Sequence, residues 1–193
     1  MIKTRLSTIV ILAVLCVRPL GLLSVVTDEN KVILGPGYQE GQKSRQVLSF
    51  VPPADWMKDE QAAKKLGLHA VIVPDGKSIE NADRVVTIAF QKKDLSKQGL
   101  ANLKNFARLD IQNTMTQFPD CQAARWQPSG LDPVKMNFFS IELYGREKDK
   151  PSPHHLLILE ATDGYFSITL TAATVEELRR PAYEDFFNSI SLK

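Results

Sequence analysis

The clearest pattern of apolar and polar positions lies near the end of the chain. Residues 156–161 form an almost unbroken apolar run of strand length, which is typical of a strand covered on both faces. Asp163 and Gly164 follow, a pair that favours a tight hairpin turn with a positive φ at the glycine. Residues 165–172 then alternate, and Phe166, Ile168 and Leu170 are expected to face inward. The pattern therefore predicts a β-hairpin whose first strand lies in the middle of a sheet.

Two short helices are predicted after this hairpin. Thr174 and Glu177 have the spacing of a capping box, which marks a helix start. Pro181 has no amide to donate, so we expect one helical turn before it and a second helix that begins near it. The residues expected to lie on the sheet are Leu178, Ala182, Phe186 and Ile190, and those expected to face solvent are Arg179, Arg180, Glu184 and Asp185.

Similar patterns earlier in the chain predict the remaining elements. Further strands are expected at residues 47–51, 68–73, 84–91, 122–127 and 136–144. One helix is expected over residues 56–66, with Asp55 as its cap and Gly67 at its end. A longer helix over residues 95–118, stopped by Pro119, carries an apolar stripe that we interpret as core packing: Leu100, Leu103, Ala107, Ile111, Met115 and Phe118.

These elements predict an α+β fold, a mostly antiparallel sheet with helices packed on its faces. The whole set is assigned to a single domain, residues 46–193. Residues 145–155, rich in charge and proline, are expected to form an exposed, mobile connection between two strands.

The first 24 residues are typical of a targeting segment. Lys3 and Arg5 precede an uncharged run over residues 6–17, which is shorter than the about 20 residues that span a bilayer. A signal peptide is therefore the leading interpretation of residues 1–24. Because a second apolar patch follows, an uncleaved N-terminal anchor over residues 6–26 is the alternative. Residues 25–45, which are mostly polar and contain glycine and proline, are expected to be a flexible linker.

Charge and cysteine content narrow the classes of partner. Three of the 24 basic residues lie in the leader, which leaves 21 basic against 22 acidic residues in the remainder. A nucleic-acid-binding protein would normally carry a basic surplus, so nucleic acid is not expected as a partner. Cys121 is the one cysteine after the leader, so no intramolecular disulfide is available and a packed core must stabilise the fold.

The residues that bear chemistry do not form a recognised motif. The sequence contains no HExxH, CxxC, GxSxG or P-loop string, so no catalytic or cofactor-binding residue is assigned and no cofactor is expected. His154 and His155 are the candidates for metal ligands. Successive strand residues point to opposite faces, so the two rings are not expected to converge without Glu160 or distant carboxylates to complete a site.

Three other residues each have a structural and a functional interpretation. Trp56 is expected to be an apolar plug, with stacking on a ligand or partner as the alternative. His69 is expected to share a face with Val71 and Val73 as a partly buried residue. Cys121 follows the carboxyl end of a helix, where the helix dipole disfavours a thiolate, and is predicted to be a packing residue of low reactivity.

Three strings, FVPPADW, GYFSITLTAATVEEL and FFNSISL, resemble the PsbP-like family, which includes bacterial envelope proteins of the DcrB type. The resemblance covers residues 46–192. It implies an α-β-α sandwich used mainly for binding or assembly near membranes, without an active site common to the family. Asp55 stands where such proteins often have a glycine before the tryptophan.

Together these observations favour an exported, non-catalytic binding or accessory module of the cell envelope, periplasmic or extracellular. The expected partner is an envelope protein or a small ligand. The N-terminal segment would hold the module itself near the membrane. One alternative is a small hydrolase or metal-dependent enzyme assembled from residues distant in sequence, such as His69, Cys121 or the two adjacent histidines. Another is a module that binds a small apolar ligand between sheet and helix.

Overall fold

The computed structural model of the chain describes residues 32–34, 46–97, 100–117, 120–147 and 150–193. The predicted leader lies outside these residues. So does most of the predicted linker, of which residues 32–34 form a strand. None of the helices in the described residues is both long and apolar enough to cross a membrane.

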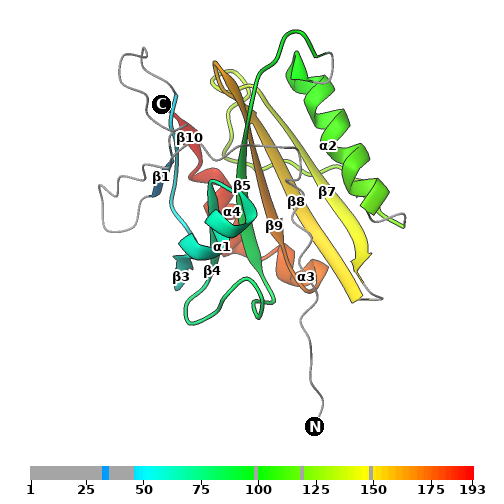
Figure 1. Ribbon diagram of the computed structural model, residues 1–193. Helices are drawn as coiled ribbons and strands as arrows, with labels where there is room; N and C mark the ends of the chain where they lie inside the picture. The colour runs from blue at the N-terminus through cyan, green and yellow to red at the C-terminus, as the bar shows by residue number, and fades with distance from the viewer. Residues whose placement is uncertain (1–31, 35–45, 98–99, 118–119, 148–149) are drawn as a thin grey trace.

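Seven strands form the main sheet, which runs through the middle of the molecule (Figure 1). Their order is β3-β4-β5-β9-β8-β7-β6, and each neighbouring pair is antiparallel. The hairpin predicted from the sequence is β8 and β9, and β9 lies at the centre of the sheet. The strands are β3 (Trp56–Lys58), β4 (Ala70–Pro74), β5 (Val85–Lys92), β6 (Gln122–Ala124), β7 (Phe138–Glu147), β8 (Lys150–Glu160) and β9 (Gly164–Thr171).

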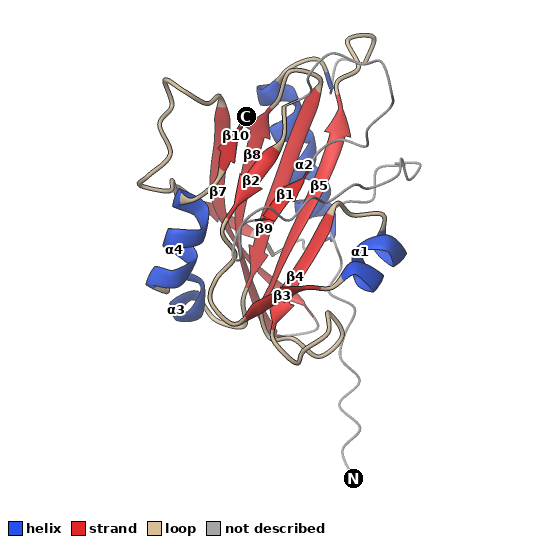
Figure 2. Cartoon of the chain, turned by 90° about the vertical axis from the view of Figure 1, so that its left-hand side faces the viewer, coloured by secondary structure: helices blue, strands red, loops and turns tan. Residues whose placement is uncertain are grey.

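A second, smaller sheet and four helices cover the main sheet (Figure 2). The small sheet has the order β1-β2-β10, from β1 (Val32–Leu34), β2 (Leu48–Phe50) and β10 (Ser191–Leu192). The helices are α1 (Glu60–Leu66), α2 (Leu103–Gln117), α3 (Val175–Leu178) and α4 (Pro181–Asn188). One face of the main sheet packs against α1 and α2, and the other packs against α3, α4 and the small sheet. The predicted α+β class and the α-β-α layering are confirmed.

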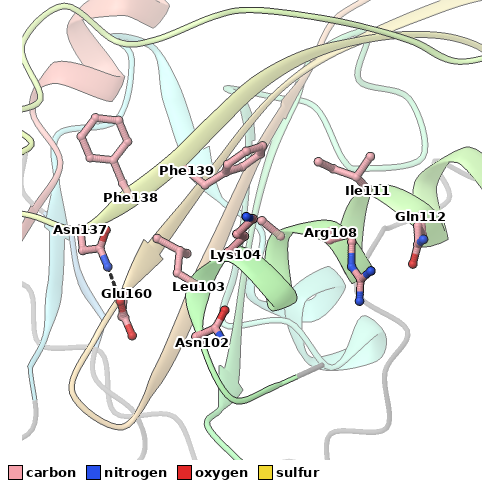
Figure 3. Close-up of a pocket in the computed structure, with 11 residues that line it drawn as sticks. Asn102, Leu103, Lys104, Arg108, Ile111, Gln112, Asn137, Phe138, Phe139 and Glu160 are labelled. Atoms are coloured by element: carbon pink, nitrogen blue, oxygen red, sulfur yellow. Dashed lines mark hydrogen bonds between the residues drawn. The ribbon is translucent and has the colours of Figure 1, made fainter. Parts of the chain in front are cut away.

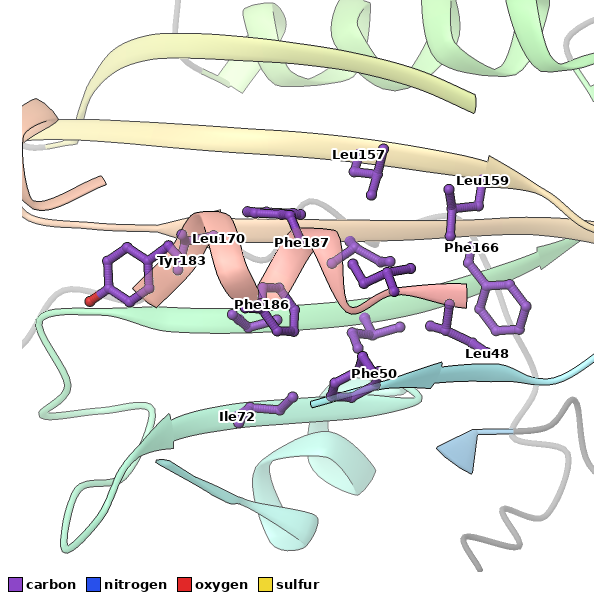
Figure 4. Packing of buried hydrophobic residues seen from close by; sticks show 14 of the residues in the cluster. Leu48, Phe50, Ile72, Leu157, Leu159, Phe166, Leu170, Tyr183, Phe186 and Phe187 are labelled. Atoms are coloured by element: carbon purple, nitrogen blue, oxygen red, sulfur yellow. The ribbon is translucent and has the colours of Figure 1, made fainter. Parts of the chain in front are cut away.

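The larger core cluster lies between the main sheet and α4 (Figure 4). Phe166 from β9, Phe186 from α4 and Phe50 from β2 are fully buried there. The rings of Phe50 and Phe186 meet edge to face at 5.6 Å, an arrangement that aromatic pairs favour. On the opposite face, Phe106 of α2 stacks on Tyr165 of β9 at 4.6 Å. Alternation along β9 thus supplies both cores; the inward positions of Phe166, Ile168 and Leu170 are as predicted, and the core formed by Tyr165 on the other face was not predicted.

The first predicted helix begins later than expected. Trp56–Lys58 form β3 and pair with β4, and the N-cap of α1 is Asp59 rather than Asp55. The Asp59 carboxylate accepts a hydrogen bond from the amide of Ala62 at 2.9 Å. The prediction at Asp55 is wrong because Trp56 is drawn into the core, where its ring meets Tyr183 edge to face at 5.7 Å. Gly67 ends α1 with φ 67°, as predicted.

Helix α2 is shorter than predicted and rotated about its axis. It begins after Asn102, whose side chain accepts a hydrogen bond from the amide of Asn105 at 2.9 Å. Met115, predicted to be in the core, is 43% exposed, whereas Thr114 is fully buried. Stacking of Phe106 on Tyr165 fixes this rotation, because it draws the neighbouring stripe of the helix onto the sheet. Phe118 and Pro119 lie outside the described residues.

Segment 145–155 was predicted to be a mobile connection, and this prediction is wrong. Strand β7 continues to Glu147 and β8 begins at Lys150, with Gly145 opposite Ser152. The proline pattern that suggested a loop is tolerated because β9 ends opposite His154. Pro153 lies beyond that point, where its missing amide costs no ladder hydrogen bond to β9.

The hairpin turn forms at the predicted place but in another conformation. Gly164 does not have a positive φ; the described glycines that do are Gly67 and Gly76. The turn is closed by a hydrogen bond from the Ala161 amide to the Gly164 carbonyl at 2.8 Å. Gly164 is required for space instead, because a Cβ there would overlap the Phe90 ring.

The helices after the hairpin follow the prediction closely. The hydroxyl of Thr174 accepts a hydrogen bond from the Glu177 amide at 3.1 Å, and Pro181 opens α4. The expected apolar stripe is wrong at Ala182, which is exposed, while its neighbour Tyr183 is buried. The larger ring of Tyr183 takes the core position, where it contacts Trp56.

Candidate functional site

The two adjacent histidines lie on β8 and face opposite sides of the main sheet. His154 is on the α2 side, with Nδ1 2.8 Å from the Thr171 hydroxyl, and burial lowers its pKa to about 4. His155 is on the α3 and α4 side, next to Glu142. Glu160 is paired with Lys93 at 2.7 Å and accepts a hydrogen bond from Asn137. Within the described ranges, no three histidine, cysteine or acidic side chains are grouped to hold a metal ion.

The other candidates are part of the packing. Trp56 is half-buried against the larger core cluster. The ring of His69 contacts Phe90 at 5.6 Å, so its predicted place on the face of Val71 and Val73 is wrong. A bend in the backbone at this residue turns the side chain toward the aromatic rings, and burial lowers its pKa to about 4. Cys121 is 5% exposed, and burial raises the pKa of its thiol.

A charged network that the sequence did not reveal surrounds His155. Its Nε2 lies 2.7 Å from one oxygen of Glu142, and Arg179 donates to the other oxygen at 2.7 Å. Arg179 also donates to the Tyr144 hydroxyl at 2.7 Å. The His155 ring stacks on Trp126 with a centroid distance of 3.9 Å. Arg179 is exposed, as predicted, and it also joins the end of α3 to strand β7.

Burial and the neighbouring charges keep His155 and Glu142 in one protonation state at neutral pH. Burial lowers the pKa of His155, an effect that its contact with Glu142 only partly offsets. Burial raises the pKa of Glu142, but hydrogen bonds from Arg179 and His155 lower it by more. We therefore expect a neutral imidazole that donates from Nε2 to an ionised carboxylate.

A cavity of about 470 Å³, here called the His155 pocket, opens beside this network. A carboxylate that orients an imidazole is a common arrangement for a general base. However, the described residues that line the pocket include no serine, threonine, cysteine or lysine that this imidazole would activate: Trp126, Gln127, His155, Arg179, Arg180, Pro181, Glu184 and Asp185. The network is best explained as a clamp that fastens α3 and α4 to the main sheet.

The larger cavity, about 670 Å³, is a groove between α2 and the start of β7 (Figure 3). Leu103, Ala107 and Ile111 of α2 line one side, and Phe138 and Phe139 line the other. We call this cavity the α2 groove. Phe139 and Ile111 are half-buried, so apolar surface remains accessible within the groove, whereas the Phe138 side chain packs against the larger core cluster on the opposite face of the sheet.

The groove follows from the side-chain sizes along α2. Leu103, Ala107 and Ile111 recur at intervals of four residues and therefore lie on one stripe of the helix. Ala107 has the shortest side chain of the three, and its place between two larger residues leaves room above the sheet. The next stripe carries Lys104, Arg108 and Gln112, which are exposed along the outer lip.

Polar residues close one end of the groove. Asn102, Asn137 and Glu160 line that end, and Asn137 donates a hydrogen bond to Glu160 (Figure 3). The negative charge of Glu160 is already offset by Lys93. By contrast, neither Lys104 nor Arg108 forms an ion pair with another described residue. The outer lip therefore carries two positive charges next to an apolar floor.

Asp110 is a second feature that sequence reasoning missed. It is 8% exposed on the inner side of α2, where one carboxylate oxygen accepts a hydrogen bond from Ser167 at 3.0 Å. Burial raises its pKa to about 6, although the hydrogen bond from Ser167 opposes the shift. Asp110 lies three residues after Ala107 and seven after Leu103. This spacing could have indicated that its side chain is buried, but the prediction considered only apolar residues.

Comparisons with known proteins add information on the fold. No family model matches the sequence, and no curated protein matches it either. The structure matches cyanobacterial PsbP (CyanoP) from Synechocystis over 91% of this chain and 100% of that one, with 12% identity and a TM-score of 0.50. The chain has a PsbP-like fold.

Two further solved structures are similar. LpqN, described as involved in cell envelope biogenesis of Mycobacterium tuberculosis, matches with a TM-score of 0.52 and 12% identity, over 80% of this chain and 87% of that one. A protein from Bacteroides thetaiotaomicron matches at TM-score 0.40 and 11% identity, over 76% of this chain, which spans 45% of that protein's length. The PsbP-like fold implied by the sequence strings is thus confirmed, and at these identities the likeness concerns the fold alone.

Proposed function

We propose that the chain is an exported, non-catalytic binding module of the cell envelope whose binding site is the α2 groove. The observation that carries this proposal is the groove itself. Its volume of about 670 Å³ is in the range of ordinary small-molecule sites, and its floor is formed by aliphatic and aromatic side chains. Soluble proteins seldom leave such a surface uncovered without a binding role.

The envelope location rests on separate observations. The first 24 residues have the basic head and apolar core of a signal peptide. LpqN, which has a similar fold, is described as involved in cell envelope biogenesis. The mature module would then be periplasmic or extracellular, held near the membrane by residues 25–45 or by an uncleaved anchor.

A binding role is favoured over catalysis because the side chains that bear chemistry lie apart. His154 and His155 face opposite sides of the sheet, Cys121 is buried with a raised thiol pKa, and His69 is packed against aromatic rings. The pair of Glu142 and His155 resembles part of an active site, but Arg179 already occupies the other carboxylate oxygen.

The proposal is tested with N-phenyl-1-naphthylamine, an uncharged dye that fluoresces in apolar sites. The purified protein is expected to bind it, and Ile111→Glu is expected to weaken binding by about tenfold or more, because the new carboxylate would be desolvated by the bound dye. Met115→Glu is the matched control, since Met115 is exposed on the same helix and does not line the groove. Absence of dye binding, or equal loss in both variants, would refute the proposed site.

A further inference from the structure

We infer that the natural ligand of the α2 groove is an amphipathic anion, an unbranched acyl chain that ends in a carboxylate. This inference rests on the proposed function and adds the chemical class of the ligand. It is carried by the juxtaposition of an elongated apolar floor and an uncompensated positive lip along the same two turns of α2.

The shape of the floor suits an extended chain. Leu103 and Ile111 are eight residues apart, which corresponds to about 12 Å along the helix axis. Phe139 faces this stripe from β7, whereas the Phe138 ring points away from α2, toward the opposite face of the sheet (Figure 3). A narrow apolar ligand lying parallel to α2 would contact Leu103, Ile111 and Phe139 together, whereas a compact ligand would contact only some of them.

The charges on α2 specify the sign of the headgroup. Lys104 and Arg108 are its two cationic residues, one turn apart on the outer lip, and its one acidic residue, Asp110, is buried on the inner side. A carboxylate near the lip would therefore meet two cations without a competing anion from the helix. Arginine adds a fork geometry that matches a carboxylate.

Other charged residues of the chain differ in whether they have an ion-pair partner. Several other described lysines have acidic partners, as in the pairs of Lys97 with Asp94 and Lys65 with Glu80, whereas the exposed Lys64 and Lys77 form no ion pair with a described residue. At the polar end of the groove, Lys93 offsets Glu160 at 2.7 Å, so that carboxylate would not repel an anion strongly. The lip is thus a place where a ligand would supply the missing negative charge.

The test compares three amphiphiles with the same chain length, each displacing the bound dye at neutral pH below its aggregation threshold: dodecanoate, dodecanol and dodecyltrimethylammonium. Dodecanoate is expected to bind most tightly. The double variant Lys104→Gln with Arg108→Gln should bind dodecanoate about three- to tenfold more weakly, the range for losing two exposed charge contacts, and bind dodecanol unchanged. Added salt should weaken binding of dodecanoate by the wild-type protein only.

The matched control is Lys64→Gln with Lys77→Gln, which removes the same charge from exposed positions that do not line the groove. Equal affinity for dodecanoate and dodecanol, or an equal loss in the control, would overturn the inference. If Ile111→Glu still abolished dye binding in that case, the proposed function would stand without it. A wild-type protein that bound neither the dye nor any of the amphiphiles would defeat both.

Discussion

Burial changes the acid–base behaviour of individual side chains under α2. Asp110 has its pKa raised to about 6, and His154 has its pKa lowered to about 4, because desolvation disfavours the charged form of each group. At neutral pH, His154 is uncharged, whereas Asp110 is largely ionised despite its burial. The packing of α2 on the sheet therefore includes an electrostatic cost at neutral pH.

The variant Asp110→Asn is expected to be more stable than the wild-type protein at neutral pH. The folded-state pKa of Asp110, about 6, is above its unfolded value of 3.8, so the folded protein binds this proton more tightly. Its contribution to stability is present below pH 3.8 and is lost as the pH rises through 6. The gain in unfolding free energy at neutral pH should be about 1–3 kcal/mol and should vanish below pH 4.

Urea unfolding at several pH values measures this difference. Because the buried histidines are present in both proteins, their own pH dependence cancels in the comparison. Asp185→Asn is the control, since Asp185 is exposed on α4. A gain of the same size at low and neutral pH would show that ionisation of Asp110 is not the cause.

Gly164→Ala is expected to destabilise the protein by about 1–3 kcal/mol, the usual range for overpacking. The new Cβ would overlap the Phe90 ring and lie 2.5 Å from the Gln91 carbonyl oxygen, which belongs to the backbone and cannot move freely. Gly130→Ala should cost less, because the three atoms nearest to its Cβ belong to the side chain of Asn188 and not to the backbone. Denaturation midpoints that rank these variants in the opposite order would contradict this account.

At the scale of elements, the sequence was sufficient to predict helices, strands and turns wherever local chemistry and packing favour the same structure. The β8–β9 hairpin and the break at Pro181 were predicted because turn residues, alternation and proline all indicate the same structure. The rotation of α2 was not predictable, because stacking of Phe106 on Tyr165 joins residues far apart in sequence. The network around Glu142 and Arg179 was missed for the same reason.

The start of α1 can be tested directly, because Asp55 and Asp59 are alternative N-caps of this helix. Asp59→Ala should destabilise the protein by about 1 kcal/mol, because it removes the N-cap of α1. Asp55→Gly should have no cost or be slightly stabilising, because Asp55 has a φ of 62° that glycine adopts more readily. Thermal unfolding of both variants decides between the two caps, and a larger loss for Asp55→Gly would support the assignment made from the sequence.

At the scale of the whole molecule, the two faces of the main sheet differ in how completely they are covered. Helices α3 and α4, the small sheet and the clamp around Glu142 cover one face and leave the smaller His155 pocket, which is lined mostly by polar and charged residues. On the other face, α2 leaves the groove beside β7. The face under α2 is therefore where a ligand would be held, and the sequence had suggested it only as one alternative among several.

Export is expected to remove residues 1–24, with cleavage near Gly21 or Ser24. Cell fractionation combined with N-terminal sequencing of the recovered protein is the measurement. Intact protein in the membrane fraction would instead favour an anchor over residues 6–26. Full-length protein in the cytosol, with Met1 retained, would contradict export.

The most direct test of the binding account is photolabelling with a dodecanoate that carries a diazirine along its chain, followed by mapping of the modified peptides. The account predicts adducts on both walls of the α2 groove, in residues 102–112 and 137–139, and loss of these adducts in Ile111→Glu but not in Met115→Glu. Adducts concentrated at the His155 pocket, or spread over the surface and unaffected by Ile111→Glu, would contradict it.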